Sequence, residues 1–435
     1  MTTLLDQLTV NHAPGPHFEA AAPLPPGTAA PVRLIAYYLP QFHPVPQNDA
    51  WWGGGFTEWT NVTKAVPRFQ GHYQPRLPGE LGFYDLRMPE VLQRQAELLR
   101  SHGLEGLCFH HYWFGGQTLL DTPIRLLLDN PQIDLPFCIN WANENWTRRW
   151  DGNDSEILMA QHHSAEDDIA FAASLEPMLR DPRYIRINGR PLLMLYRPGL
   201  LPDAAATVRR WRAHFQAAGL GDPYVVMPLA SGTDDPRKHG MDAAAGFPPH
   251  RTGFNQAPVR DGVELFDRAY KGTVVRYADM VATALADHPD QFRYFPGVCP
   301  GWDNEARKPG AGFCVQGSTP AAYGAWLGAA CARMLAEPDA QHRIVFINAW
   351  NEWAEGAHLE PDRHFGHAYL AETARVVARL AGLSPEALRE VAAPVPARTH
   401  APRRIADLPD LVAKNLFYHA SNATDRLAKW LRQKM

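Results

Sequence analysis

The chain has 435 residues, of which 46% are hydrophobic and 20% charged, and its formal net charge is -4 at pH 7. This composition is typical of a soluble globular protein, and the charge gives no overall attraction to nucleic acid or to an anionic lipid surface. The aromatic and histidine content is high, with 13 Trp, 14 Tyr, 19 Phe and 19 His, a mixture that carbohydrate sites favour.

The chain begins with a polar and then Ala/Pro-rich segment, residues 1–31, which we expect to be a flexible lead-in. It lacks the basic and apolar regions of a signal peptide, and no apolar run is long enough to span a bilayer. We therefore expect a cytoplasmic protein. The cysteines are odd in number and have no CxxC spacing, which predicts reduced core residues at Cys108, Cys138, Cys299, Cys314 and Cys331.

Strand-like apolar runs alternate with helical patterns along the next 350 or so residues, with lengths typical of βα units. We predict strands at residues 34–39, 106–111, 137–141, 192–196, 224–229, 243–247, 294–298 and 344–348. We predict helices near residues 89–102, 165–179, 204–218, 277–287, 320–337 and 366–380. Strands this hydrophobic are buried on both faces, which predicts an α/β fold, a (β/α)8 TIM barrel over residues 32–383. The alternative, a doubly wound sheet, needs a glycine fingerprint after its first strand, and none is present there.

Two segments stand apart from this alternation. Residues 40–88 form a long loop-like connection, and long loops in compact domains are usually functional. Residues 384–435 combine a Pro/Ala/Arg-rich linker with an amphipathic helical tail at 408–435, in which Leu411, Leu416 and Trp430 fall at helical spacing beside lysines. This tail either docks on its own barrel or rests on a membrane surface or a partner.

Polar and aromatic residues follow nearly every predicted strand. In a barrel these positions share one rim, so residues far apart in sequence converge there. A single strand-end aromatic is more often packing than ligand binding, but six strand ends with the same character favour a shared glycan site. The predicted substrate-binding residues are Tyr37, Tyr38, His43, Glu58, Trp59, His110, His111, Tyr112, Asn140, Trp141, Asn143, Glu144, Trp146, Trp302, Asn348, Trp350, Asn351, Trp353 and Glu360.

Glu352 and Glu355, three residues apart after the last strand, are the candidate catalytic acid/base pair. Glycosidic chemistry needs a proton donor for the departing oxygen and a second carboxylate to offset charge at the anomeric carbon. Structural roles are the alternatives: Glu352 would cap a following helix and Glu355 would pair with Arg363. Glu144 and Glu360 are weaker catalytic candidates than this pair.

The same sequence gives little support for a metal or a nucleotide cofactor. Each of the two His-His pairs is adjacent in sequence, and neighbours on a strand point to opposite faces, so neither pair forms a two-ligand clamp. There is no P-loop, no GxGxxG and no D-x-D triplet, and Asp303-Asn304-Glu305 is the nearest approach to a metal-diphosphate motif. We predict no metal and no cofactor.

The segment from Asn351 to Gly356, followed by Leu359-Glu360-Pro361, resembles the Asn-Glu-Trp-His-Glu-Gly segment of glycoside hydrolase family 99, the endo-α-mannosidases and endo-α-mannanases. Residues 35–380 look more closely like the WbsX-type proteins of O-antigen and capsule gene clusters, often labelled glycosyltransferases. The motifs that carry this closer match are residues 37–43, 54–59, 140–144 and 348–353.

The resemblance implies a (β/α)8 barrel and a retaining reaction without a metal. It places a base toward the sugar's own 2-hydroxyl at Glu352, giving a 1,2-anhydro intermediate, and an acid and then base at Glu355. The family histidine before the second glutamate is Ala354 here, which puts strict mannoside specificity in doubt.

From these features we expect a retaining glycosyltransferase of lipopolysaccharide O-antigen or capsule biosynthesis. Its substrate would be a glycan or a lipid-linked oligosaccharide, not a nucleic acid. A location at the inner membrane would suit the second interpretation of residues 408–435, a peripheral contact with the membrane, whereas the first, a helix docked on the barrel, needs no membrane. The alternatives are an endo-α-mannosidase-like glycoside hydrolase and a non-catalytic carbohydrate-binding barrel.

Overall fold

The computed structural model describes residues 3–148, 153–230, 235–259 and 263–383. The expected amphipathic tail at 408–435 lies outside the described residues, so both interpretations of it stay predictions. Among the described residues, no helix is both long enough and apolar enough to cross a membrane.

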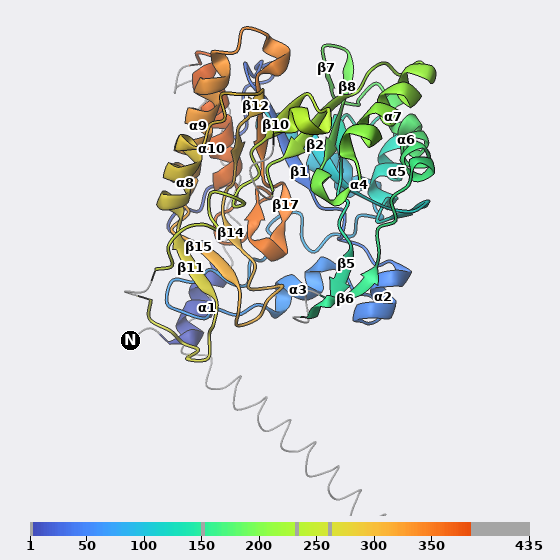
Figure 1. Ribbon diagram of the computed structural model, residues 1–435. Helices are drawn as coiled ribbons and strands as arrows, with labels where there is room; N and C mark the ends of the chain where they lie inside the picture. Colours follow the sequence, from blue (N-terminus) through green and yellow to red (C-terminus); the bar gives the residue numbers. More distant parts are fainter. Residues whose placement is uncertain (1–2, 149–152, 231–234, 260–262, 384–435) are drawn as a thin grey trace, which may run out of the picture. The chain divides into compact units, whose positions relative to one another are not determined.

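Eight parallel strands form a barrel and follow one another around it in chain order (Figure 1). Each overlaps one of the predicted strands, so the predicted (β/α)8 barrel is confirmed. The strands are β1 (Arg33–Tyr38), β2 (Gly106–Phe114), β4 (Phe137–Trp141), β8 (Arg190–Leu195), β9 (Tyr224–Pro228), β10 (Ala243–Ala245), the stretch made of β12 (Tyr294–Phe295) and β13 (Gly297–Val298), and β16 (Ile344–Ile347).

The barrel closes through the stretch that contains Pro296. Its first part, β12, pairs with β10, and its second part, β13, pairs with β16, which in turn pairs with β1. Proline has no N–H to donate, which divides the stretch into two short strands. The carbonyl of Pro296 still accepts a hydrogen bond from the N–H of Phe346 at 2.9 Å. All eight carboxyl ends therefore face one rim, as in other parallel barrels.

Among the described residues, seven α-helices of eight residues or more follow strands of the barrel, and six of them overlap the predicted helices. Their starts carry typical signals: Ser164 caps one helix, Asp203 another, and Thr319 caps a third that begins with proline. The helix that sequence patterns missed is α5, which is short. The helices are α4 (Pro89–Ser101), α5 (Thr122–Asp129), α6 (Ala165–Arg180), α7 (Ala204–Ala217), α8 (Tyr277–Ala286), α9 (Pro320–Leu335) and α10 (Ala368–Leu380).

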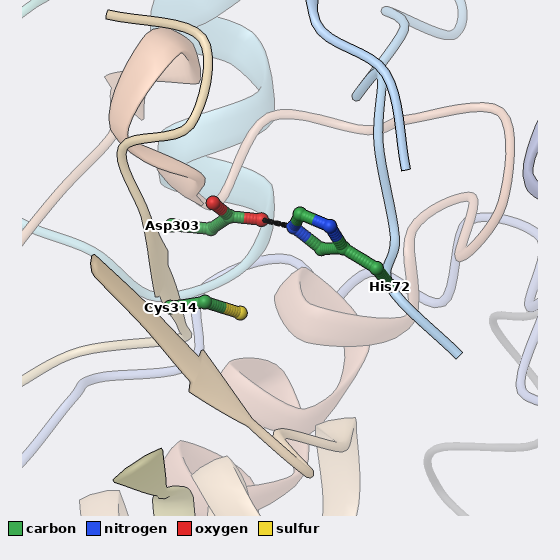
Figure 2. A group of neighbouring side chains, drawn as sticks. All are labelled: His72, Asp303 and Cys314. Atoms are coloured by element: carbon green, nitrogen blue, oxygen red, sulfur yellow. Dashed lines mark hydrogen bonds and ion pairs between the residues drawn. The ribbon is translucent and has the colours of Figure 1, made fainter. Parts of the chain in front are cut away.

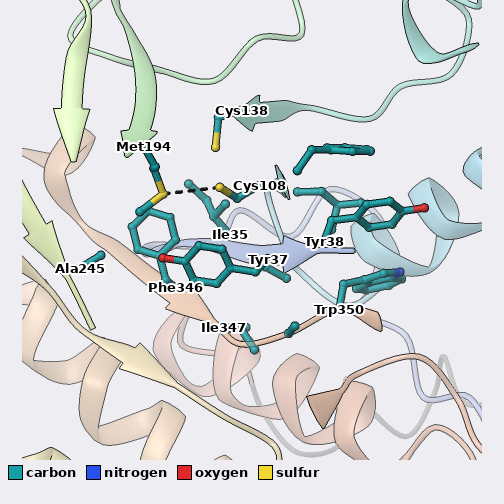
Figure 3. Packing of buried hydrophobic residues seen from close by; sticks show 14 of the residues in the cluster. Ile35, Tyr37, Tyr38, Cys108, Cys138, Met194, Ala245, Phe346, Ile347 and Trp350 are labelled. Carbon is teal, nitrogen blue, oxygen red and sulfur yellow. Dashed lines mark hydrogen bonds between the residues drawn. The ribbon is translucent and has the colours of Figure 1, made fainter. Parts of the chain in front are cut away.

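The barrel interior is filled by side chains from several strands, as Figure 3 shows for Tyr37, Cys108, Met194 and Phe346. The ring of Tyr37 lies 5.5 Å from that of Phe346, centroid to centroid, and Cys108 Sγ lies 3.5 Å from Met194 Sδ. All five cysteines are buried and unpaired, as expected of reduced core residues. This interior is a packed core below the rim, so a ligand site has to lie above it.

Most of the smaller elements lie toward the lower part of the coloured ribbon in Figure 1. Residues 40–88, expected to be loop-like, contain two helices. The smaller elements are α1 (Leu4–His12), α2 (Pro46–Trp52), α3 (Glu58–Lys64), the hairpin of β5 (Trp146–Arg148) and β6 (Asn153–Met159), the sheet of β11 (Thr273–Arg276), β15 (Phe313–Gln316) and β14 (Trp302–Asp303), and the hairpin of β17 (Asn351–Glu352) and β18 (Ala357–His358).

The segment expected to be a flexible lead-in is instead tied to the barrel over residues 3–31. Asn11 Nδ2 donates hydrogen bonds of 2.8 Å to the carbonyls of His72 and Gln74. The N–H of Leu24 donates to the carbonyl of Ser101 at 2.7 Å, and the Leu24 side chain is buried. An Ala/Pro-rich composition suggested mobility, but these long-range contacts depend on the folded barrel and leave no local signal.

Candidate active site

A cavity of about 380 Å³ lies at the carboxyl end of the barrel. Its lining comes from the ends of β1, β2, β4, β8 and β10, from β14, and from the segment after β16. The lining residues are Leu39, Gln41, Asn48, Trp51, Trp52, His110, Tyr112, Ala142, Glu144, Asn145, Trp146, Thr147, Leu158, Tyr196, Phe247, His250, Phe254, Trp302, Asn304, Arg307, Lys308, Asn348, Glu352 and Glu355.

A tight turn presents the two candidate catalytic carboxylates to this cavity. Glu352 ends β17, Glu355 ends a single 3-10 turn, and Gly356 follows with a φ of 61°. A Cβ at Gly356 would lie 2.8 Å from Arg76 Nε and 3.0 Å from Asp303. Only glycine suits a position with both a left-handed backbone and so close an approach. The turn therefore fixes the direction in which both glutamates point.

One guanidinium, that of Arg307, contacts three carboxylates at the site. Its Nη1 lies 2.6 Å from Glu355 Oε1, and its Nη2 lies 3.1 Å from Glu352 Oε2 and 2.9 Å from Glu58 Oε2. All four side chains are largely withdrawn from solvent, with exposures of 14% for Arg307, 9% for Glu352, 19% for Glu355 and 0% for Glu58. Three buried carboxyl groups face a single cation here, and three negative charges would repel one another with little water to screen them. One of the carboxyl groups is therefore expected to retain a proton.

Glu352 is the group on which this proton is expected. Burial, opposed by the nearby charge of Arg307 and reinforced by those of Glu355 and Glu58, raises the pKa of Glu352 to about 8. The structural alternative for Glu352, a helix cap, finds no support, because its side chain makes no capping hydrogen bond to the following turn. The alternative for Glu355 also fails, since its partner is Arg307, while Arg363 Nε donates to the carbonyl of Pro78 at 3.4 Å.

Aromatic rings line the cavity in two groups. The first aromatic wall consists of Trp51 and Trp52 from the segment after β1, Tyr112 from the end of β2, and Trp146 from the segment after β4. The ring of Trp146 lies 5.8 Å from Trp51 and 5.1 Å from Tyr112. Flat apolar surfaces of this kind suit the C–H face of a sugar ring.

The second aromatic wall consists of Tyr196, Phe247, His250, Phe254 and Trp302, from the segments after β8, β10 and β13. Centroid distances of 5.4 Å between Tyr196 and Phe247 and 5.9 Å between Phe254 and Trp302 show how closely the rings pack. Strand β16, which leads to the carboxylates, lies between β13 and β1. The carboxylates therefore stand between the two aromatic walls.

Buried polar atoms accompany the aromatic walls. Gln41 Oε1, Asn48 Nδ2 and Trp302 Nε1 have no hydrogen-bond partner within the part of the chain that the structure describes, although all three residues are buried and line the cavity. A buried polar atom without a partner is costly, and a hydroxyl-rich ligand or water would satisfy such atoms. The lining thus offers hydrogen bonds as well as apolar faces.

The predicted site residues divide into two groups. Eight line the cavity: His110, Tyr112, Glu144, Trp146, Trp302, Asn348, Glu352 and Glu355. The other thirteen do not, and they are buried around the rim: Tyr37, Tyr38, His43, Glu58, Trp59, His111, Asn140, Trp141, Asn143, Trp350, Asn351, Trp353 and Glu360.

Several members of the second group hold the rim together. Asn143 exchanges hydrogen bonds of 2.9 and 2.8 Å with the backbone of Arg197, and Asn351 exchanges bonds of 2.7 and 3.0 Å with the backbone of Leu39. Asn140 Nδ2 lies 3.1 Å from His110 Nδ1, and burial lowers the pKa of His110 to about 4, so its ring is neutral at pH 7. These contacts orient residues that face the cavity.

Glu360 is enclosed by four hydrogen-bond donors. Trp350 Nε1 and Gln95 Nε2 donate to its Oε1 at 2.8 and 2.6 Å. Trp353 Nε1 and the Tyr84 hydroxyl donate to its Oε2 at 2.7 and 2.8 Å. Burial raises the pKa of Glu360 to about 7, against the effect of these four bonds. With four donors directed at its oxygens, Glu360 ties together elements of the barrel.

A His/Asp/Cys group suggests a metal site but does not have suitable chemistry (Figure 2). His72 Nδ1 accepts the N–H of Arg68 at 3.0 Å, so a neutral ring carries its proton on Nε2, which lies 2.7 Å from Asp303 Oδ2. That leaves no ring lone pair for a metal. Burial, then the charge of Asp303, raises the pKa of the Cys314 thiol far above its usual range. Its hydrogen bonds instead connect β14, through Asp303, to the segment that carries Arg68 and His72.

Sequence reasoning missed Arg307 and most of both aromatic walls. Arg307 is five residues beyond the predicted Trp302 and belongs to no strand-end motif. A detectable signal was the presence of three buried glutamates near the rim, because buried carboxylates need a cation. Trp51 and Trp52 lie in the long connection whose length already indicated function.

Residues 34–373 match the family model described as glycosyltransferase WbsX. Two proteins named "Uncharacterized protein WxcX", from two strains of Xanthomonas campestris pv. campestris, are each 44% identical to this chain over 364 residues. These matches cover 84% of this chain and 52% of each relative. The chain therefore spans about half the length of the relatives it matches.

Solved structures with a similar arrangement are more distant. The GH99 endo-alpha-mannosidase from Bacteroides thetaiotaomicron shares 17% sequence identity, with a TM-score of 0.48 over 82% of this chain and 98% of that one. A GH113 beta-1,4-mannanase shares 10% identity, with a TM-score of 0.33 over 67% of this chain and 92% of that one. The assignment of the barrel here rests on its own strand pairing.

Proposed function

Because the chain belongs to the family described as glycosyltransferase WbsX, we propose that it is a retaining carbohydrate-active enzyme that transfers a sugar within a glycan. The observation that carries this proposal is the pair Glu352 and Glu355, held on adjacent nitrogens of Arg307 beside a cavity with aromatic walls. Two carboxylates sharing one guanidinium are closely spaced, which favours retention over inversion.

The proposed roles are those that the resemblance to glycoside hydrolase family 99 implies for Glu352 and Glu355. Glu355 donates a proton to the departing glycosidic oxygen and later takes one from the incoming hydroxyl. Glu352 acts as base toward the 2-hydroxyl of the sugar being transferred, so the proton that its raised pKa retains must first pass to Glu355, which then donates it to the departing oxygen. Arg307 stabilises the negative charge on both groups as protons move.

The acceptor decides between two outcomes. If a sugar hydroxyl enters after the first bond has broken, the enzyme is a transferase, and if water enters, it is a hydrolase. Hydrolysis is the second candidate, and the lining favours it: it holds two lysine or arginine side chains, Arg307 and Lys308, and Arg307 is already occupied by carboxylates. Such a lining suits a neutral glycan better than a nucleotide diphosphate.

The proposed setting is assembly of a lipopolysaccharide O-antigen or capsule on a lipid carrier. The family name supports glycosyl transfer, and the amphipathic pattern of residues 408–435 would bring the enzyme to a membrane surface. In this setting the substrate is a lipid-linked oligosaccharide at the inner membrane.

The test incubates the purified protein with α-mannosides, and separately with nucleotide-sugar and lipid-linked donors, and follows the products by mass spectrometry. A lengthened glycan means transfer and a free sugar means hydrolysis. The double variant Glu352→Gln/Glu355→Gln is the control for contaminating activity. Glycan binding without turnover in any mixture would favour the remaining alternative, a non-catalytic binding barrel.

A further inference from the structure

Glu58 is fully buried and does not line the cavity, although it belongs to the same charge cluster as the proposed catalytic pair. Its Oε1 accepts a hydrogen bond from Asn61 Nδ2 at 3.1 Å. Its Oε2 accepts a hydrogen bond from Nε of Arg307 at 3.0 Å and lies 2.9 Å from Nη2 of the same guanidinium. Both oxygens are therefore engaged by protein groups, and Glu58 is not placed to touch a substrate.

Arg307 contacts Glu58 along one edge of its guanidinium and the catalytic pair with Nη2 and Nη1. Because a guanidinium is planar and rigid, a carboxylate fixed on one edge sets the direction of its remaining N–H groups. A lysine ammonium has no such fork and would not hold three partners in fixed directions.

The backbone that carries Arg307 is also fixed. The N–H of Arg307 donates to the carbonyl of Asn304 at 3.0 Å, and the amide of Asn304 accepts the N–H of Phe313 at 2.7 Å. Glu305, next to Asn304, accepts the Gly310 N–H at 2.6 Å and pairs with Arg68 at 2.5 Å. Arg307 is thus held at its backbone by its own loop and at its head group by Glu58.

We propose that Glu58 and Arg307 are positioning residues. Glu58, which does not line the cavity, holds the guanidinium of Arg307, and Arg307 fixes the carboxylates of Glu352 and Glu355. The inference rests on the proposed function, since it takes those two glutamates as the catalytic pair. It goes further by assigning a buried residue on α3, remote in sequence, to control of their chemistry.

This arrangement predicts how charge changes propagate. The ionisable groups that face Glu352 are Arg307, Glu355, Glu58 and the Tyr112 hydroxyl. Removing the negative charge of Glu58 ends its repulsion of ionised Glu352. The positive charge of Arg307 is then shared by fewer carboxylates and stabilises ionised Glu352 more. Ionised Glu352 is then favoured, and its pKa falls.

The experiment is an infrared titration of the protonated carboxyl band, which needs no substrate. The band of Glu352 is the one lost in Glu352→Gln, and this separates it from the bands of Glu360 and Asp168, two other buried carboxyls with a raised pKa. In Glu58→Gln we expect the midpoint of the Glu352 band to fall by at least about one pH unit, a tenfold change in its protonation equilibrium.

The matched control is Asp168→Asn on α6, another buried carboxylate paired with an arginine, Arg210, but without contact to Glu352. This control should leave the Glu352 midpoint in place. An unchanged midpoint in Glu58→Gln, or equal shifts in both variants, would overturn the proposal.

Arg307→Lys is the second variant, and its use does not depend on whether Glu58→Gln folds. It keeps the positive charge but loses the planar guanidinium that fixes the carboxylates of Glu352 and Glu355 in place. We therefore expect kcat to fall at least about tenfold, while KM changes less than about twofold. A kcat close to that of the wild type would overturn the positioning role. If the wild type turns over no glycan, the proposed function fails, whereas the infrared midpoints still decide whether Glu58 controls Glu352.

Discussion

Nη1 of Arg307 lies 2.6 Å from Oε1 of Glu355, a contact between a loop after β14 and the turn after β16. The same guanidinium also contacts Glu352, so two carboxylates of one short segment share a cation that comes from a different segment. Because the shared cation stabilises charge on either acid, a proton can move to or from one without leaving the other uncompensated.

The first prediction concerns the two glutamates. Glu355→Gln and Glu352→Gln should each lower kcat by at least about a hundredfold, the usual scale for a positioned acid or base, with glycan binding largely retained. Steady-state kinetics and calorimetric titration with the glycan test this. Wild-type rates in either variant would remove that residue from the mechanism.

The second prediction is the pH dependence of kcat/KM. The proposed roles need one proton in the pair, on Glu355, while Glu352 is ionised. Because the pair retains a single proton and loses it as the pH rises through about 8, the reactive form disappears across that range. We therefore expect kcat/KM to fall as the pH rises through about 8. A rise across that range would contradict this, because it would show that Glu355 keeps a proton of its own after Glu352 has ionised.

The third prediction tests the second aromatic wall. Trp302→Phe keeps an aromatic ring but removes the Nε1 donor that lacks a partner among the described residues, and Trp302→Ala removes both. KM should rise moderately in the first, by roughly threefold to tenfold, and further in the second. Equal KM values in all three proteins would place the glycan elsewhere. Phe83→Ala, an exposed aromatic outside the cavity lining, is the control.

The fourth prediction concerns stability. Glu360→Gln replaces an acceptor of four hydrogen bonds with an amide whose NH2 group faces donors. We expect a loss of about 2–4 kcal/mol in the free energy of unfolding, measured with urea. Glu97→Gln breaks an exposed pair with Arg94 and should change stability by less than about 0.5 kcal/mol. A loss in Glu360→Gln no larger than in this control would contradict the structural role.

The fifth prediction concerns the tail. Deleting residues 408–435 should reduce flotation with liposomes that contain anionic lipid, because the tail combines an apolar stripe with lysines and arginines. Unchanged partition after the deletion would leave the docked-helix interpretation.

The barrel was predictable because its signal is local. A strand buried on both faces must be nearly continuously apolar, so 137–141 and 344–347 stand out in the sequence whatever surrounds them. The short helix α5 gave too few turns for a clear period. The stretch around Pro296 was predicted as one strand, and the proline divided it by removing one backbone donor.

The site was predictable in part, for a related reason. The sequence places His110, Tyr112 and Trp146 at strand ends, and strand ends meet at one rim in any parallel barrel. Side-chain direction is a different matter: Trp141 lies at the same rim, yet it stacks on Phe171 with centroids 4.4 Å apart and is fully buried. Whether a strand-end ring faces the cavity or the helices depends on the bends and turns that follow the strand.

The sequence by itself determined the positions of the eight strands and the presence of two glutamates after the last one. The tertiary structure alone decided that these glutamates share Arg307 with Glu58, which is 249 residues from Arg307 along the chain. Apolar periodicity is a property of neighbouring residues and can be read from them. A buried ion pair depends on which charges the closed barrel brings within a few ångströms, and the linear spacing of Glu58, Arg307 and Glu352 contains no trace of that distance.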